Sequence, residues 1–197
     1  CYIPVGHVDG KQLDLTQVLF QLSGLFADPT LTMVGHNLKY DLTILETVGL
    51  MPRCRLADTM LMSYVLDAAA GRHDLDSLAK RLLGVETTSL EVVCGKGVKQ
   101  ISFAEVALEP ASHYASEDAD ITLRLYNQFV ERLNQVPSLH SIYQELELLV
   151  MQVLREMENH GALLDADILN AQSVILGVRL EQLESEAQAL AGRSFNL

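Results

Sequence analysis

The chain has 197 residues, of which 49% are hydrophobic, so it is long enough and apolar enough to build a proper core. Its formal net charge of −12 at pH 7 excludes a non-specific clamp for duplex DNA, but not a small nucleic-acid site in which metal ions neutralise the phosphates. The three cysteines are widely spaced, which argues against a disulfide framework and favours a reducing, cytoplasmic setting. The sequence has no signal peptide and no apolar run long enough to span a bilayer, so we expect no membrane partner.

The first quarter of the chain predicts two strands and two helices. The opening CYIPVG predicts a strand, and because a domain rarely starts in the middle of a sheet we expect a fragment. Residues 12–27 predict an amphipathic helix. Its apolar face consists of Leu15, Val18, Leu19, Leu22 and Leu25. LTMVGH predicts a buried strand, after which Asn37 can cap a helix that ends near Gly49.

The middle of the chain predicts shorter elements. Residues 55–58 lead into a helix that Asp58 caps, and Asp74 caps a short helix that stops at Gly84. TTSLEVVCGKGVKQ has no clear periodicity and predicts a loop. SFAE, which begins at Ser102, has the pattern of a capping box and predicts one more helical turn.

The last part of the chain predicts long helices. Pro110 suits the first turn of a helix that runs to about Asn134. At Pro137 the composition changes to an almost wholly helical, Leu/Glu-rich sequence. We therefore expect a domain boundary there, between residues 1–137 and 138–197, and helices beyond it that pack as a separate unit.

One carboxylate falls on an apolar helix face. Asp41 is followed at helical spacing by Ile44, Leu45 and Val48, so it shares their stripe. A buried carboxylate without a partner is strongly destabilising. Its partner can be a lysine, a helix N-terminus or a backbone amide, or it can be a metal ion.

A second carboxylate shows the same pattern. In HYASEDADITL, Tyr114 and Asp118 lie four residues apart, and Ile121, Leu125 and Phe129 continue their face. Two inward aspartates on separate helices resemble the oxygen ligands of a hard divalent cation. Salt bridges or helix caps remain the alternative.

These segments resemble a known family. NLKYD, followed by YASEDAD, is similar to the second and third motifs of DEDD-type 3′–5′ exonucleases with tyrosine in the third motif. DTMLMSYVLDAAAGRHDLDSLAKRLLG and GKGVKQISFAEVALEPASHYASEDADITL resemble the proofreading domain of family A bacterial DNA polymerases. The resemblance covers nearly the whole chain. It implies an α/β, ribonuclease H-like fold whose first strands are missing, followed by the α-helical start of a polymerase domain.

The resemblance also implies roles for the acidic residues. Asp41 and Asp118 would ligate Mg²⁺ or Mn²⁺, and the hydroxyl of Tyr114 would orient the attacking water. In such a site two metal ions activate the water and stabilise the leaving 3′ oxygen.

Four more residues resemble family positions that touch the terminal nucleotides of a single-stranded 3′ end. They are Asn37, Tyr40, Arg72 and Leu90. Asn37 can equally cap a helix. For Tyr40 and Leu90 a place in the core is favoured over a contact with a base. Arg72 has no obvious structural task, which favours a phosphate contact.

The family's first motif, D-x-E, is absent, because no aspartate of the chain is followed two places later by glutamate. Since Asp41, Tyr114 and Asp118 are present, we interpret the absence as truncation. The two-metal site is then incomplete and the fragment itself should be inactive. The implied parent is a monomeric, cytoplasmic bacterial DNA polymerase that extends a primer-template with dNTPs and excises mispaired 3′ ends of DNA.

Two alternatives stay open. One is a stand-alone DEDD-type exonuclease. ELELLVMQVLREMENHGALLDADIL argues against it, because this segment resembles the entry to a family A polymerase domain. The other is a catalytically silent scaffold domain of a polymerase, which a true loss of D-x-E in the parent would favour.

Overall fold

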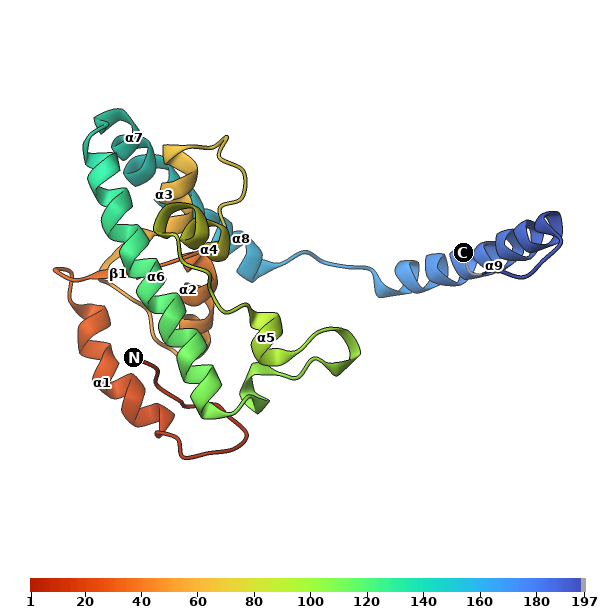
Figure 1. The fold of residues 1–197 in the computed structure, drawn as a ribbon, viewed down its shortest axis with the longest axis horizontal. Coiled ribbons are helices and arrows are strands. Elements are labelled where there is room, and N and C mark those ends of the chain that lie inside the picture. The colour runs from red at the N-terminus through yellow and green to blue at the C-terminus, as the bar shows by residue number, and fades with distance from the viewer. Residues whose placement is uncertain (196–197) are drawn as a thin grey trace. The chain divides into compact units, whose positions relative to one another are not determined.

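The computed structural model describes residues 1–195, and the chain divides into two compact units (Figure 1). The first unit is Cys1–Asn159, and it contains both strands of the described chain. The second unit begins at His160 and contains one long helix, α9 (Ala166–Ala191). Within residues 1–195, none of the helices combines the length and the hydropathy that crossing a bilayer requires.

The sheet consists of two short parallel strands. β1 (Thr32–Gly35) and β2 (Arg55–Asp58) pair over their full length, with Gly35 opposite Asp58. Helix α2 (Leu38–Thr47) lies between them in the sequence, as a parallel connection requires. The prediction of a strand in LTMVGH is confirmed, whereas residues 55–58 form a strand and not simply the entry to a helix.

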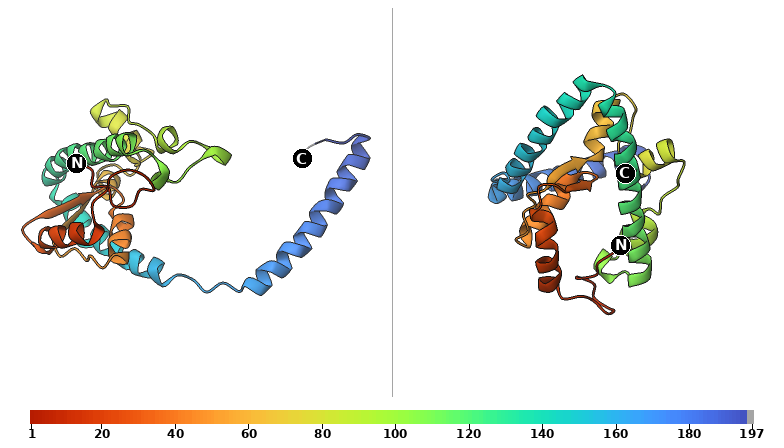
Figure 2. Two further views of the ribbon diagram at one scale, coloured as in Figure 1. Left: turned by 90° about the horizontal axis from the view of Figure 1, so that it is seen from below. Right: turned by 90° about the vertical axis from the view of Figure 1, so that its left-hand side faces the viewer.

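Helices make up most of the first unit, and Figure 2 shows the long helix α6 extending along it. The α-helices are α1 (Leu15–Ala27), α3 (Thr59–Leu66), α4 (Leu75–Leu78), α5 (Leu90–Cys94), α6 (Leu108–Asn134), α7 (Pro137–Ile142) and α8 (Leu148–His160). The π-helical turns are η1 (Ala79–Leu83) and η4 (Tyr143–Glu147), and the 3₁₀ turns are η2 (Gly97–Lys99) and η3 (Phe103–Glu105).

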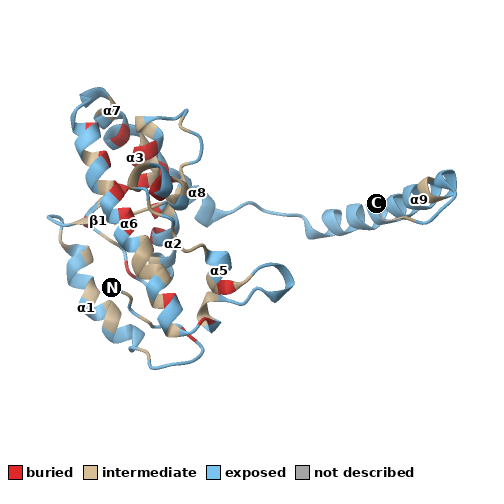
Figure 3. Ribbon diagram, in the orientation of Figure 1, coloured by how far each residue is buried: buried red, intermediate tan, exposed pale blue. Residues whose placement is uncertain are grey.

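The core lies where α6 and α3 pack beside the sheet, and buried residues cluster there in Figure 3. The inward stripe predicted for α6 is confirmed, because Ile121, Leu125 and Phe129 are at most 1% exposed. Leu38 and Leu78 join them from α2 and α4. The core therefore fixes α6 against the end of the sheet where α2 begins.

Of the predictions for SFAE, CYIPVG and the segment after Thr87, the first is confirmed and the other two are wrong. The SFAE capping box forms: Ala104 N–H donates to Ser102 Oγ and Ser102 N–H donates to Glu105 Oε2. CYIPVG is not a strand, because it pairs with no strand in residues 1–195. The predicted loop after Thr87 contains the short helix α5.

The helices after residue 137 do not start a separate unit. Tyr143, Leu148 and Met151 are at most 8% exposed and belong to the main core, so the expectation of separate packing is wrong up to Asn159. A compact unit in space need not coincide with a family's domain limit. The division at residue 137 into exonuclease and polymerase sequence therefore stays a prediction.

The carboxylate of Asp58 joins the sheet to two helices. It accepts hydrogen bonds from the backbone N–H groups of Asn37 and Leu38 at the start of α2, and from those of Met60 and Leu61 at the start of α3. Asp58 is 1% exposed. Four donors at two helix N-termini thus satisfy one buried carboxylate.

Replacing this carboxylate should be strongly destabilising. Asp58→Ala leaves four buried or half-buried N–H groups without acceptors, so we expect the free energy of unfolding to fall by about 3 kcal/mol or more. Asp14→Ala is the matched control, because Asp14 caps only α1. It should cost about 1 kcal/mol. Urea denaturation followed by circular dichroism measures both, and equal losses would contradict the double-cap interpretation.

Candidate active site

A cavity of about 930 Å³ opens between β1, α2 and α6. Its lining includes Asn37, Tyr40 and Asp41 from the start of α2 and Asp118 from the middle of α6. Both predicted metal ligands, Asp41 and Asp118, thus line one cavity although they lie on different helices.

Asn37 adopts an unusual backbone conformation at the cavity. Its φ of 60° and ψ of 49° make it the only residue other than glycine with positive φ in residues 1–195. The prediction that its side chain caps α2 is wrong: the side chain makes no capping hydrogen bond, and Asp58 accepts from the first N–H groups instead. The Asn37 side chain is therefore not needed as a cap and lines the cavity.

Gly35 allows α2 to approach the strand closely. A Cβ atom at this position would lie 2.6 Å from Leu38 Cδ1 and 3.3 Å from Asp41 Oδ2. The first distance is shorter than real Cβ contacts, so any other residue at position 35 would have to displace the buried side chain of Leu38. Gly35 was not singled out in the sequence, because a glycine at a strand end has many possible causes.

Asp41 faces the cavity, not the core. Its neighbours Ile44 and Leu45 also line the cavity, and Ile44 is 49% exposed, so the stripe interpreted as core is a cavity wall. Burial raises the pKa of Asp41 above its usual range, and the negative charge of Asp58 raises it further. Asp41 is therefore a carboxylate that would gain from a cation.

Asp118 and Tyr114 lie four residues apart on α6, and each shifts the pKa of the other. Burial raises the pKa of Asp118, while its hydrogen bond with Tyr114 lowers it. Burial, with the charge of Asp118, raises the pKa of Tyr114 to about 12. Tyr114 is thus a neutral phenol near pH 7. Its ring lies 5.8 Å from that of Phe103, centroid to centroid.

Asp76 also acts on this pair, which the sequence did not suggest. Its negative charge contributes to the raised pKa values of both Tyr114 and Asp118. Asp76 itself accepts a hydrogen bond of 2.7 Å from the hydroxyl of Thr87. No spacing pattern links Asp76 to α6, so only the fold brings it near.

Of the other predicted DNA contacts, Tyr40 lies at the cavity, whereas Arg72 and Leu90 lie outside its lining. Tyr40 is 66% exposed and lines the cavity, so it is not a core residue. Arg72 and Leu90 do not line the cavity. Arg72 does have a structural partner, because its Nε lies 2.8 Å from Asp74 Oδ2. Leu90 is 45% exposed at the start of α5 and is not a core leucine.

The carboxylate oxygens of Asp41 and Asp118 are suitable ligands for a divalent cation, but two residues supply few of them. Carboxylate oxygens are the ligands that Mg²⁺ and Mn²⁺ prefer. Within residues 1–195 no group of three or more His, Cys, Asp or Glu side chains could hold a metal ion. Asp41 and Asp118 can therefore supply part of a coordination sphere, but not the whole of a two-metal site.

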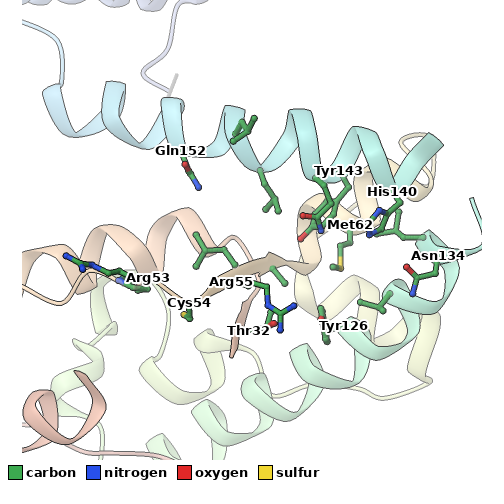
Figure 4. A pocket seen from close by; sticks show the side chains of 18 residues that line it. Thr32, Arg53, Cys54, Arg55, Met62, Tyr126, Asn134, His140, Tyr143 and Gln152 are labelled. Atoms are coloured by element: carbon green, nitrogen blue, oxygen red, sulfur yellow. The ribbon is translucent and has the colours of Figure 1, made fainter. Parts of the chain in front are cut away.

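Another cavity, of about 500 Å³, lies between β2, the end of α6 and the helices that follow it (Figure 4). Its lining includes Arg55, His140 and Tyr143 but no carboxylate. None of the predicted site residues lines it. The carboxylate-lined cavity is therefore the candidate active site.

Comparison with known proteins identifies similar chains. Residues 1–134 match the family described as 3′–5′ exonuclease, of the DNA polymerase A type. The chain is 43% identical to DNA polymerase I of Pseudomonas aeruginosa over 201 residues, covering 100% of the chain and 22% of that protein. It is 37% identical to DNA polymerase I of Rhizobium leguminosarum, and this match covers 100% of the chain and 20% of that protein. The chain thus spans about a fifth of the length of these relatives.

A solved structure has a similar fold. It is described as the POL domain of Pol1 from M. smegmatis in complex with DNA primer-template and dNTP. The TM-score is 0.62 at 22% identity, covering 96% of this chain and 29% of that one. With the family match, this likeness confirms the predicted α/β exonuclease fold followed by helices.

The two carboxylates should lower the stability of the fold near neutral pH. A raised pKa means that the folded state binds the proton more tightly than the unfolded state, so stability is lost as the pH rises through and above the ordinary aspartate range. Asp41→Asn and Asp118→Asn should therefore raise the melting temperature at pH 7, and the gain should vanish at pH 3.

Asp120→Asn is the matched control for this effect. Asp120 lies on the same helix, is 65% exposed in its side chain and pairs with Arg124 at 3.5 Å. Its replacement should leave the melting temperature unchanged or slightly lower. Thermal unfolding in the absence of divalent cations measures all three variants. A lower melting temperature for Asp41→Asn and Asp118→Asn at pH 7 would show that both carboxylates are already satisfied.

Proposed function

We propose, since the chain belongs to the 3′–5′ exonuclease family of DNA polymerase A, that Asp41, Tyr114 and Asp118 take part in removing nucleotides from a 3′ end of DNA. The observation that carries the proposal is that Asp41 and Asp118 line one cavity with raised pKa values. Two carboxylates that line one cavity and have no cationic partners in the described chain are suited to a divalent cation.

The carboxylates would hold the cation and Tyr114 would orient a water molecule. When bound, divalent cations supply charge that activates water and stabilises the leaving oxygen. Asp41 and Asp118 would offer oxygens to Mg²⁺ or Mn²⁺ from α2 and α6, which both line the cavity. Because the pKa of Tyr114 is raised to about 12, its phenol keeps its proton at neutral pH and can only donate or accept a hydrogen bond, not act as the base.

The cavity rim offers contacts for a single strand. Tyr40 presents an exposed ring on which a base can stack, and the Asn37 amide can donate to the sugar-phosphate. We propose that Arg72 and Leu90 contact nucleotides outside the cavity. Arg72 must then exchange Asp74 for a phosphate, which a salt bridge exposed at the surface permits.

The parent protein is proposed to be a monomeric, cytoplasmic bacterial DNA polymerase. The relatives are named DNA polymerase I, and the Pol1 structure is a complex with primer-template and dNTP. By this analogy the parent would extend a primer with dNTPs, and residues 1–137 would form its exonuclease part and 138–197 the helical start of its polymerase part. The residues from Pro137 onward lie outside the exonuclease family match.

Activity should depend on carboxylates beyond these two. The chain alone, given a single-stranded oligonucleotide and Mg²⁺ or Mn²⁺, should release nucleotides very poorly, because two carboxylates cannot fix two cations in line with a phosphate. A longer protein that adds the D-x-E carboxylates should be active, and Asp118→Ala should reduce its rate about 100-fold or more. Gel analysis of a 5′-labelled oligonucleotide, whose shortening reports loss of 3′ nucleotides, measures both.

Asp120→Ala serves as the control in the longer protein and should retain activity. Robust release by the chain alone, abolished by Asp118→Ala, would mean that other residues complete the site. A longer protein that contains D-x-E and still lacks activity would favour the silent scaffold.

A further inference from the structure

Helix α8 and the turn before it hold the helix that carries Asp41. Four polar contacts from residues 143–159 reach α2 itself or the backbone of Asp58, the residue whose carboxylate caps α2. We propose that this segment is a brace that positions Asp41 for cation binding, with Tyr143 and Glu46 as positioning residues. The inference rests on the proposed function of the cavity, and it concerns residues outside the cavity lining.

The first contact reaches the N-terminus of α2 through Asp58. The hydroxyl oxygen of Tyr143 accepts a hydrogen bond of 2.9 Å from the backbone N–H of Asp58. Tyr143 is fully buried and Asp58 is 1% exposed. Asp58 in turn accepts from the N–H groups of Asn37 and Leu38. The Tyr143 hydroxyl thus fixes Asp58, whose carboxylate caps the first turn of α2.

The other three contacts reach the side of α2 directly. Arg155 Nη1 lies 3.0 Å and Asn159 Nδ2 lies 2.8 Å from Glu46 Oε2, near the C-terminal end of α2. Lys39, in the first turn, forms an ion pair with Glu158. Lys39 and Glu46 are seven residues apart, so they lie on one face of the helix, two turns from each other.

This face differs from the one that carries Asp41. Leu38 and Leu42 point into the core, and Asp41 lines the active-site cavity. A space of about 160 Å³, lined in part by Lys39 and Met151, separates α2 from α8. Polar side chains therefore reach across a gap, and close packing does not hold the two helices together there.

The geometry makes the brace a control on Asp41. α2 has only ten residues, and it is held at its first turn by Asp58 and near its last turn by Glu46. Asp41 lies between these two points. A shift of α2 of about 1 Å would move its carboxylate relative to Asp118, and displacements of this size can lower a rate about 100-fold.

The test compares Tyr143→Phe/Glu46→Gln with the unchanged full chain. Two measurements are made: Mn²⁺ affinity by electron paramagnetic resonance, and hydrogen exchange of the amides of residues 38–42. The variant should bind Mn²⁺ about tenfold more weakly, which is a typical effect of residues behind the metal ligands. Exchange in residues 38–42 should become faster than in α6.

Two control variants separate positioning from stability. Ser102→Ala removes the capping box at η3, away from α2, and should lower the melting temperature while leaving Mn²⁺ affinity and α2 exchange unchanged. Tyr126→Phe removes another tyrosine hydroxyl from the cavity that Tyr143 lines and should change neither measurement. Ser102→Ala and Tyr143→Phe/Glu46→Gln are compared at the same loss of melting temperature. If both variants then weaken Mn²⁺ binding and speed amide exchange in residues 38–42 equally, the effects come from lost stability and the brace is refuted.

Failure of the proposed function would look different. If Asp41→Asn binds Mn²⁺ as tightly as the unchanged chain, the cavity is not the cation site and the proposed function is overturned. The exchange measurement then decides the brace alone: faster exchange in residues 38–42 supports a brace on α2, and unchanged exchange overturns it.

Discussion

A single buried carboxylate, that of Asp58, organises the end of the sheet. It accepts backbone N–H groups from the starts of both α2 and α3, and the partial positive charge of two helix N-termini compensates its own charge. Because α2 begins at this carboxylate, the course of the chain through Asn37 and the place of Asp41 one turn later follow from it. The left-handed backbone at Asn37 is the local strain that this arrangement contains.

Three aspartates near the sheet end differ in how their charge is satisfied. Asp58 is the most buried and has four N–H donors, whereas Asp118 is half-buried, Asp41 is exposed to the cavity, and both have raised pKa values. Burial alone therefore does not identify a functional carboxylate. Missing compensation is the better criterion for a candidate, because a fold that holds two such groups in one cavity loses stability that a bound cation would restore.

The sequence predicted what depends on neighbours along the chain. The stripe of α6, the Ser102 capping box and the strand LTMVGH are all local patterns, and each forms. The strand predicted for CYIPVG does not form, because a strand needs a partner that no local pattern supplies. The cap predicted for Asn37 does not form either, because Asp58, from a distant segment, accepts the N–H groups at the start of α2. For the candidate site, the apolar stripes singled out Asp41 and Asp118, whose role as metal ligands stays a prediction. Gly35 and Asp76 escaped notice, because their effects arise from contacts that only the fold creates.

The central claim is that Asp41 and Asp118 share one cation in the cavity between β1, α2 and α6. Mn²⁺ titration of the ¹⁵N-labelled chain, followed by paramagnetic broadening of backbone amides, tests it most directly. The account predicts that amides near both carboxylates, in residues 35–42 and 115–122, broaden first and together, and that Asp118→Asn removes the broadening from both segments. Broadening of only one segment, or of acidic surface positions such as Glu184 and Glu186 at the same Mn²⁺ concentration, would contradict it.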